Sequence, residues 1–257
     1  MWDPRQYLRF EEDRSRAFFD LVGRIGAASA LHVVDLGCGP GQLTARLKDR
    51  WPEADVVGID SSAEMIERAA ELARPGLSFR LGEARDYRPG PEVDVVISNA
   101  MLQWIPNHEQ LLLSIADQLA GGAWLAFQVP GHAGRSTSQQ LLKELRTSQS
   151  WAELVGPIEE LFVLEPEEYL DLLAGAGWRV DTWETTYRHV LAGADAVLEW
   201  MKGTAMRPIL ARLGDRADEF CAEYGRLIAE AYPQREYGTV FPFRRIFVVA
   251  ERPHSRA

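Results

Sequence analysis

The chain has 257 residues, which is enough for one or two ordinary domains with a sizeable buried core. Hydrophobic residues make up 46% of the sequence and charged residues 26%, a balance that excludes wholesale disorder and a collagen-like chain. The formal net charge of -10 disfavours nucleic acid as a partner, because a surface that binds nucleic acid normally carries a basic stripe. A local cluster of basic residues can still bind a small anionic substrate.

The first half of the chain alternates between helix and strand patterns. An amphipathic pattern predicts a helix over residues 11–25. Short apolar runs then predict buried strands over residues 31–36, 56–60, 77–81, 93–98 and 124–129. Helix patterns separate these strands, over residues 42–51, 61–73 and from about 107 onward. This alternation is typical of an α/β protein with a doubly wound, mostly parallel sheet.

The second half adds two helical insertions to this pattern. Residues 166–175 predict a helix, and residues 178–190 and 245–250 predict two further strands. Helical patterns interrupt them over residues 136–165 and about 193–232. We predict a single domain over residues 1–257, with a helical cap formed by about 1–25, 131–165 and 193–240. This cap is expected over the carboxyl edge of the sheet, where ligands bind in open α/β folds.

A glycine-rich loop follows the first predicted strand, with the sequence Asp35-Leu-Gly-Cys-Gly-Pro-Gly41. Glycines at such a turn let backbone N–H groups approach a ligand, although a tight turn alone would also explain them. In the dinucleotide fingerprint the third glycine would fall at residue 42, which is Gln42 here. The carboxylate of Asp35 would also repel a pyrophosphate. S-adenosylmethionine (SAM) fits better, because it carries a sulfonium and an ammonium group and no phosphate.

Polar residues follow the next three predicted strands. Asp60 can accept from both hydroxyls of a ribose, Glu83 can accept from an adenine amino group, and Asn99 can line the methionine end. Taken singly, Asp60 could merely cap a helix and Glu83 could be a solvated loop residue, but their order and spacing favour a SAM site. The predicted cofactor residues are Asp35, Gly37, Cys38, Gly39, Gly41, Asp60, Ser61, Met65, Glu83, Ala84, Asn99 and Ala100.

Together these residues resemble the motifs of the class I SAM-dependent methyltransferases. The glycine loop from Asp35 to Gly41, then Asp60, Glu83 and Asn99, match that family's motifs in order. The resemblance covers the whole predicted sheet and is specific for the cofactor. It implies a Rossmann-like fold with seven strands, SAM as the cofactor and S-adenosylhomocysteine as the product.

A narrower resemblance spans nearly the full chain. The segments at residues 2–16, 98–104, 183–189, 199–208 and 241–247 look like those of the trans-aconitate 2-methyltransferases, and residues 131–165 match least. This resemblance implies formation of a monomethyl ester on one carboxylate of trans-aconitate, a small tricarboxylate. The expected partner is therefore a small anionic carboxylic acid.

Methyl transfer to a carboxylate needs little catalytic machinery. A carboxylate with a pKa near ~4 is already ionised at pH 7, so we predict no acid or base residue, and the sequence also predicts no metal site. Arg, His and Tyr side chains are expected to hold the other carboxylates of the acid. The predicted substrate residues are Tyr7, Arg16, Gln103, Trp104, Tyr187, Arg188, His189, Trp200, Arg207 and Arg245. Each of these arginines could instead be a solvated surface residue, and each aromatic residue could be ordinary core.

Other functions stay open at this point. The acceptor could be another small or carrier-bound carboxylic acid, or a hydroxyl group, which would usually need a base. A base-modifying methyltransferase is disfavoured because Ser98-Asn-Ala-Met101 does not match Asn/Asp-Pro-Pro-aromatic. A nicotinamide oxidoreductase and a non-catalytic SAM-binding protein are further alternatives.

The compartment and assembly are predicted from composition alone. Two cysteines are too few for a disulfide framework and favour a reducing compartment. The start of the chain contains no apolar stretch of the kind found in signal peptides. No segment approaches about 18 uncharged apolar residues, so no membrane span is expected. We therefore expect a cytoplasmic protein without a membrane partner, and a monomer by default.

Overall fold

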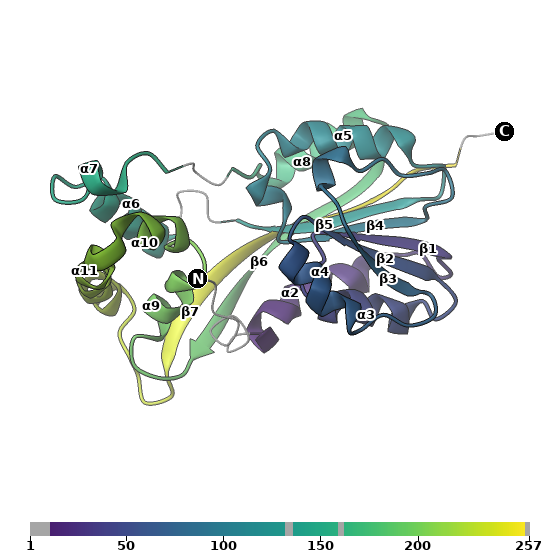
Figure 1. Cartoon of the computed structure of the whole chain (residues 1–257). Helices are drawn as coiled ribbons and strands as arrows, with labels where there is room; N and C mark the ends of the chain where they lie inside the picture. Colours follow the sequence, from purple (N-terminus) through teal and green to yellow (C-terminus); the bar gives the residue numbers. More distant parts are fainter. Residues whose placement is uncertain (1–10, 132–135, 159–161, 255–257) are drawn as a thin grey trace. The chain divides into compact units, whose positions relative to one another are not determined.

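A computed structural model of the chain describes residues 11–131, 136–158 and 162–254, and side chains from residue 15 onward (Figure 1). Its central element is a seven-stranded sheet in the order β3-β2-β1-β4-β5-β7-β6. The strands are β1 (His32–Leu36), β2 (Asp55–Asp60), β3 (Leu77–Leu81), β4 (Val95–Asn99), β5 (Trp124–Pro130), β6 (Arg179–Leu191) and β7 (Thr239–Glu251). Strands β1 to β5 pair in parallel, and β7 pairs antiparallel with β5. The predicted doubly wound, mostly parallel sheet is confirmed.

Helices cover both faces of the parallel strands. Helices α5 and α8 lie on one face, and α2, α3 and α4 lie on the other (Figure 1). Their bounds are α2 (Glu11–Arg24), α3 (Gln42–Arg50), α4 (Ala63–Ala70), α5 (His108–Gln118) and α8 (Pro166–Gly175). Two short 3-10 turns, η1 (Ala84–Asp86) and η2 (Leu102–Trp104), follow the ends of β3 and β4. Burial on both faces explains why β1 and β4 are nearly continuous apolar runs.

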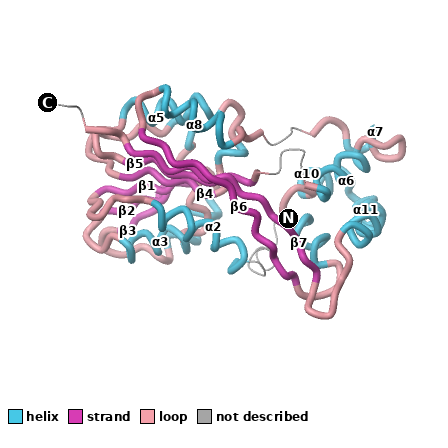
Figure 2. Tube along the Cα trace, turned by 180° about the vertical axis from the view of Figure 1, so that it is seen from behind, coloured by secondary structure: helices cyan, strands magenta, loops and turns pink. Residues whose placement is uncertain are grey.

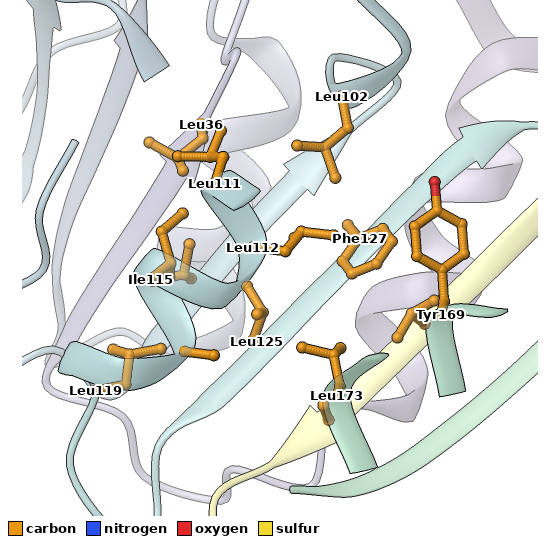
Figure 3. Close-up of a cluster of buried hydrophobic side chains, with 14 of the residues drawn as sticks. Leu36, Leu102, Leu111, Leu112, Ile115, Leu119, Leu125, Phe127, Tyr169 and Leu173 are labelled. Atoms are coloured by element: carbon orange, nitrogen blue, oxygen red, sulfur yellow. The ribbon is translucent and has the colours of Figure 1, made fainter. Parts of the chain in front are cut away.

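The main core lies between this sheet and the helices α5 and α8. Figure 3 shows Phe127 of β5 between Leu112 of α5 and Tyr169 of α8, with Leu111 and Ile115 of α5 in the same cluster but farther from Phe127. Phe127 and Tyr169 meet edge to face, with ring centroids 5.0 Å apart. This packing holds the parallel strands in place, and their carboxyl ends carry the polar residues of the candidate site.

The chain divides into two compact units. The sheet unit contains Ser15–Pro130, Phe162–Glu184 and the chain from Arg245 onward. The helical unit contains Gly131, residues 136–158 and Thr185–Arg244. Its helices are α6 (Thr137–Arg146), α7 (Ala152–Val155), α9 (Ala196–Lys202), α10 (Arg207–Leu213) and α11 (Ala217–Ala231), with the 3-10 turn η3 (Gly214–Arg216) (Figure 2). Strands β6 and β7 each run from one unit into the other.

Most of the predicted strands and helices agree with the observed ones to within about two residues, and the larger differences lie at β7 and α4. Strand β7 begins at Thr239, so the last residues of the predicted cap segment 193–240 are strand, not helix. Helix α4 ends at Ala70 instead of residue 73. From Ser15 on, α2 belongs to the sheet unit. The single-domain organisation and the position of a cap over the sheet edge stay predictions.

Candidate functional site

The glycine loop after β1 is tethered to the end of β2. The backbone N–H groups of Gly37 and Cys38 both donate to the carbonyl of Ile59, at 2.8 and 3.1 Å. The N–H of Gly39 donates to Oδ2 of Asp60 at 2.9 Å. These bonds fix the loop against the neighbouring strand, so the two sequence motifs form one site.

Two of the loop's glycines are required by close packing, and one faces open space. Gly37 has φ +79°, and a Cβ there would collide with the side chain of Met101. Gly41 has φ +84°, and a Cβ there would lie 2.8 Å from the ring of Phe79. At Gly39 no heavy atom of the described residues lies within 4 Å of a Cβ position. The loop therefore leaves room for a ligand beside its middle glycine.

Asp60 links the glycine loop to the start of α4. Its Oδ1 accepts from the N–H of Ser62 at 2.9 Å, while Oδ2 accepts from Gly39. Ser62 is the N-cap of α4, and its hydroxyl accepts from the N–H of Met65 at 3.4 Å. Ser61 is exposed and Met65 is half-buried beside it. The half-buried carboxylate of Asp60 has spare lone pairs for a polyhydroxylated ligand.

Asp35 is a buried carboxyl group at the start of the glycine loop, with 2% of its surface exposed. The hydroxyl of Thr44 in α3 donates to its Oδ2 at 2.6 Å. Its Oδ1 has no hydrogen-bond partner among the described residues. The pKa of Asp35 is raised to about 6, because burial and, less strongly, the charge of Asp60 raise it by more than the hydrogen bond from Thr44 lowers it. A buried acceptor without a donor is costly, and a cationic ligand would relieve that cost.

The end of β4 carries a second buried acceptor. Ala100 adopts φ +56°, an uncommon conformation for a residue with a side chain. Nε2 of the buried Gln103 donates to the carbonyl of Ala100 at 2.5 Å, so Oε1 of Gln103 faces away and has no partner among the described residues. The next residue, Trp104, is 56% exposed. Because β1 and β4 are neighbours, this acceptor lies at the same edge as Asp35.

The last predicted cofactor residues follow β3. Glu83 is exposed and is the N-cap of η1, and Ala84 is half-buried against the main core. Sheet order and parallel pairing bring the ends of β3, β2, β1 and β4 side by side. All of the predicted cofactor residues therefore lie along one edge of the sheet unit.

Cys38 is poorly suited to act as a nucleophile. Burial raises the pKa of its thiol well above the usual range, and the charges of Asp35 and Asp60 raise it further. Within the described parts of the chain, no group of three or more His, Cys, Asp and Glu side chains could hold a metal ion. The helices of these parts are too short or too polar to cross a membrane.

Arg245 is a second predicted substrate residue that strand register places near the predicted cofactor edge. It is 7% exposed and pairs with Pro130, at the carboxyl end of β5. Its Nη1 donates to Oε1 of Gln128 at 3.3 Å, and Nε2 of Gln128 donates to Oδ1 of Asn99 at 2.6 Å. Sequence reasoning missed Gln128. The available signal was a single amide side chain inside the apolar run at residues 124–129.

In the helical unit, three predicted substrate residues form one aromatic row. The rings of Tyr187 and His189 have centroids 6.0 Å apart, and those of His189 and Trp200 lie 5.3 Å apart. All three are buried. Arg188 is exposed on the opposite face of β6, because side chains alternate along a strand. Arg207 is exposed at the first residue of α10.

The N-terminal substrate candidates are only partly described. Arg16 is an exposed residue of α2 in the sheet unit. Tyr7 lies outside the described residues. The structure thus brings together the cofactor set with Gln103 and Arg245, and separately the row of Tyr187, His189 and Trp200.

The strand order of the sheet, together with the predicted cofactor residues along its carboxyl edge, defines the class I SAM-dependent methyltransferase fold. The YcgJ protein from Bacillus subtilis has this fold with a TM-score of 0.63 and 12% identity, covering 93% of this chain and 99% of that one. A S-adenosylmethionine dependent methyltransferase from Mesorhizobium loti matches with a TM-score of 0.54 and 16% identity, covering 93% and 99%. Residues 33–122 also match a family described as a methyltransferase domain.

Curated relatives narrow the family further. A trans-aconitate 2-methyltransferase from Mycobacterium sp. (strain KMS) is 50% identical over 97% of this chain and 99% of its own. A relative of the same name from Mycobacterium tuberculosis (strain ATCC 25177 / H37Ra) is 44% identical, with coverages of 98% and 97%. The chain belongs to the trans-aconitate 2-methyltransferase family. The predicted family and, through it, SAM as the cofactor are confirmed.

Proposed function

We propose that this protein transfers the methyl group of SAM to one carboxylate of trans-aconitate and forms a monomethyl ester. One observation carries the proposal: the same edge of the sheet unit holds a buried acceptor, Asp35 Oδ1, that has no donor among the described residues, and a buried guanidinium, Arg245. The first suits a cationic cofactor and the second an anionic acid. The names of the near-full-length relatives support the choice of acid.

The residues at the edge fit the cofactor group by group. Asp35 Oδ1 and Gln103 Oε1, which have no donor among the described residues, would each accept a hydrogen bond from its ammonium group. Asp60 would accept from the ribose hydroxyls and Glu83 from the adenine amino group. Open space beside Gly39 admits the ligand close to the backbone. When bound, SAM supplies an activated methyl group on its sulfonium.

The chemistry asks this chain for positioning, not for proton transfer. A carboxylate oxygen of the acid would form the new bond to the methyl carbon as the carbon–sulfur bond breaks, and the electron pair of that bond would stay with sulfur. No proton moves, because a carboxylic acid with a pKa near ~4 is ionised at pH 7. Alignment of the two groups supplies the rate enhancement. Arg245 would hold a carboxylate that does not react, because pairing the reacting oxygen with a cation would weaken the nucleophile.

The test is methyl transfer from labelled SAM to a panel of acids. The panel contains trans-aconitate, cis-aconitate, citrate, isopropylmalate and a long-chain dicarboxylate, and base-labile release of methanol identifies an ester. We expect selective turnover of trans-aconitate. Turnover of another acid in its place would contradict trans-aconitate as the substrate and make that acid the proposed substrate. Tight SAM binding without turnover would contradict it and favour a carrier-bound acid, a hydroxyl acceptor or a non-catalytic SAM-binding protein.

A further inference from the structure

Gln128 joins two residues of the candidate site that the sequence does not connect. It lies in β5 between β4 and β7, and only 1% of its surface is exposed. On one side it donates to Asn99 at 2.6 Å, and on the other it accepts from Arg245 at 3.3 Å. In register, Gln128 pairs directly with Asn99 of β4. Leaving a buried amide without hydrogen bonds is costly, so these bonds hold Asn99, Gln128 and Arg245 in one fixed row.

The direction of every hydrogen bond in the row follows from Arg245. A guanidinium carries only donors, so the atom of Gln128 that faces it must be the acceptor Oε1. The donor Nε2 of Gln128 then faces Asn99, which must present its own acceptor, Oδ1. The donor group of Asn99, Nδ2, is therefore turned away from Gln128. An arginine on β7 thus sets the orientation of an amide on β4, two strands away.

We propose that Gln128 is a positioning residue, which anchors Arg245 and turns the donor end of Asn99 toward the ligand. This inference rests on the proposed function and assigns a positioning residue to it. Asn99, which the sequence placed at the methionine end of the cofactor, would here use its neutral donor to hold the reacting carboxylate without quenching its charge. The cation of Arg245 would hold a second carboxylate. The fixed row keeps the two at a constant separation.

The decisive variant is Gln128→Glu, which keeps the shape but replaces the donor with a second acceptor. Arg245 keeps an acceptor in this variant, while Asn99 must rotate its amide and donate inward to the new carboxylate. The outward donor is then lost, and the added negative charge competes for Arg245. We expect the Kd of trans-aconitate, measured by calorimetry with S-adenosylhomocysteine bound, to rise about tenfold or more. Gln110→Glu, an exposed site in the first turn of α5, makes the same charge change and serves as the control.

A double-mutant cycle separates positioning from a general structural effect. Asn99→Ala should raise the Kd of the acid about tenfold in the natural background and less than about twofold in the Gln128→Glu background, because the donor is already lost there. Additive effects would overturn the proposal, and so would a Gln128→Glu variant that binds the acid normally. Steady-state kinetics should show the change mainly in KM for the acid.

Two further comparisons distinguish a failure of the proposed function from a failure of the positioning role of Gln128. If the unmodified protein binds and methylates no acid, the proposed function fails and this inference fails with it. If the unmodified protein methylates trans-aconitate but the cycle is additive, the inference alone fails. Should Gln128→Glu lose SAM binding, Gln128→Met replaces it as an apolar side chain of similar length. That variant should raise the Kd of the acid with SAM affinity retained, and an unchanged Kd of the acid would overturn the proposal.

Discussion

The hydroxyl of Thr44 donates to Asp35 at 2.6 Å, and this bond lowers the pKa of the carboxyl group, which burial raises. Burial raises the pKa of Asp35 to about 6, while Thr44 lowers it. The group therefore changes its charge within the pH range in which binding can be measured. Because Asp35 Oδ1 has no partner among the described residues, its charge is available to a cationic ligand.

The affinity for SAM should depend on pH through Asp35. An ammonium group prefers the ionised carboxylate, so binding below the pKa of about 6 must first release a proton. We expect the apparent Kd of SAM to rise about tenfold between pH 7 and pH 5, as one unit below the pKa requires. Calorimetry across this range checks it. Asp35→Asn should bind SAM more weakly and with a flat profile, and a flat profile for the unmodified protein would contradict the assignment.

The same carboxyl group should lower stability at neutral pH when no ligand is bound. Its folded pKa of about 6 exceeds the ordinary value of 3.8, so the folded state holds the proton more tightly than the unfolded state. The contribution of Asp35 is therefore fully present below pH 4 and is lost as pH rises through 6, by about 3 kcal/mol at most. Urea unfolding between pH 4 and 8 measures it as the difference from Asp35→Asn. A difference that does not change with pH would argue against a buried titrating group.

Thr44→Val should move the pH profile of SAM binding upward. Removing the hydroxyl takes away the described hydrogen bond to Oδ2 of Asp35, and Oδ1 already has no partner among the described residues. The pKa of Asp35 therefore rises further, and its ionisation requires a higher pH. At pH 6 the Kd of SAM should then rise more than at pH 8. Thr44→Ser keeps the hydroxyl and is the matched control, with a profile close to that of the unmodified protein. Equal losses at both pH values would mean that Thr44 acts only by packing.

The sequence predicted the cofactor edge because each of its residues directly follows a strand pattern. Glycines and the acids Asp35, Asp60 and Glu83 are readable at such positions, since parallel strands must bring them to one edge. The start of β7 was missed because Pro242 interrupts the run, although it lies at an exposed position of the strand. Its neighbours Phe241 and Phe243 are buried with the period of a strand.

The proposed acid-binding residues were harder to predict, because their arrangement depends on the register between distant strands. Tyr187, Arg188 and His189 are adjacent in sequence, yet alternation along β6 exposes the arginine and buries the other two. Arg245 meets Gln128 only because β7 returns antiparallel to β5. A single sequence does not specify that register, so the relation between Arg245, Gln128 and Asn99 had to come from the structure.

Gly37→Ala should damage the cofactor loop. The φ of +79° disfavours any residue with a Cβ, and the added methyl would collide with Met101. We expect a loss of about 1–3 kcal/mol in the free energy of unfolding and much weaker SAM binding. Gly23→Ala is the control, because this helical glycine in α2 has no heavy atom of the described residues within 4 Å of a Cβ position. It should be neutral or stabilising. Normal SAM binding by Gly37→Ala would show that the loop geometry is not needed.

Arg245→Ala should separate acid binding from cofactor binding. The guanidinium is buried at the carboxyl end of β5, where a carboxylate could form charge-assisted hydrogen bonds with it. Such bonds contribute about 1.5–3 kcal/mol, so the KM for trans-aconitate should rise roughly ten- to a hundredfold while the Kd of SAM changes little. Arg179→Ala removes an exposed arginine that pairs with Glu251 at 2.8 Å, and it should leave both constants unchanged. Arg245→Lys should recover only part of the loss, because an ammonium lacks the planar fork that matches a carboxylate. If Arg245→Ala instead weakens SAM and acid binding equally, the arginine supports the sheet edge as a whole and another cation must hold the acid.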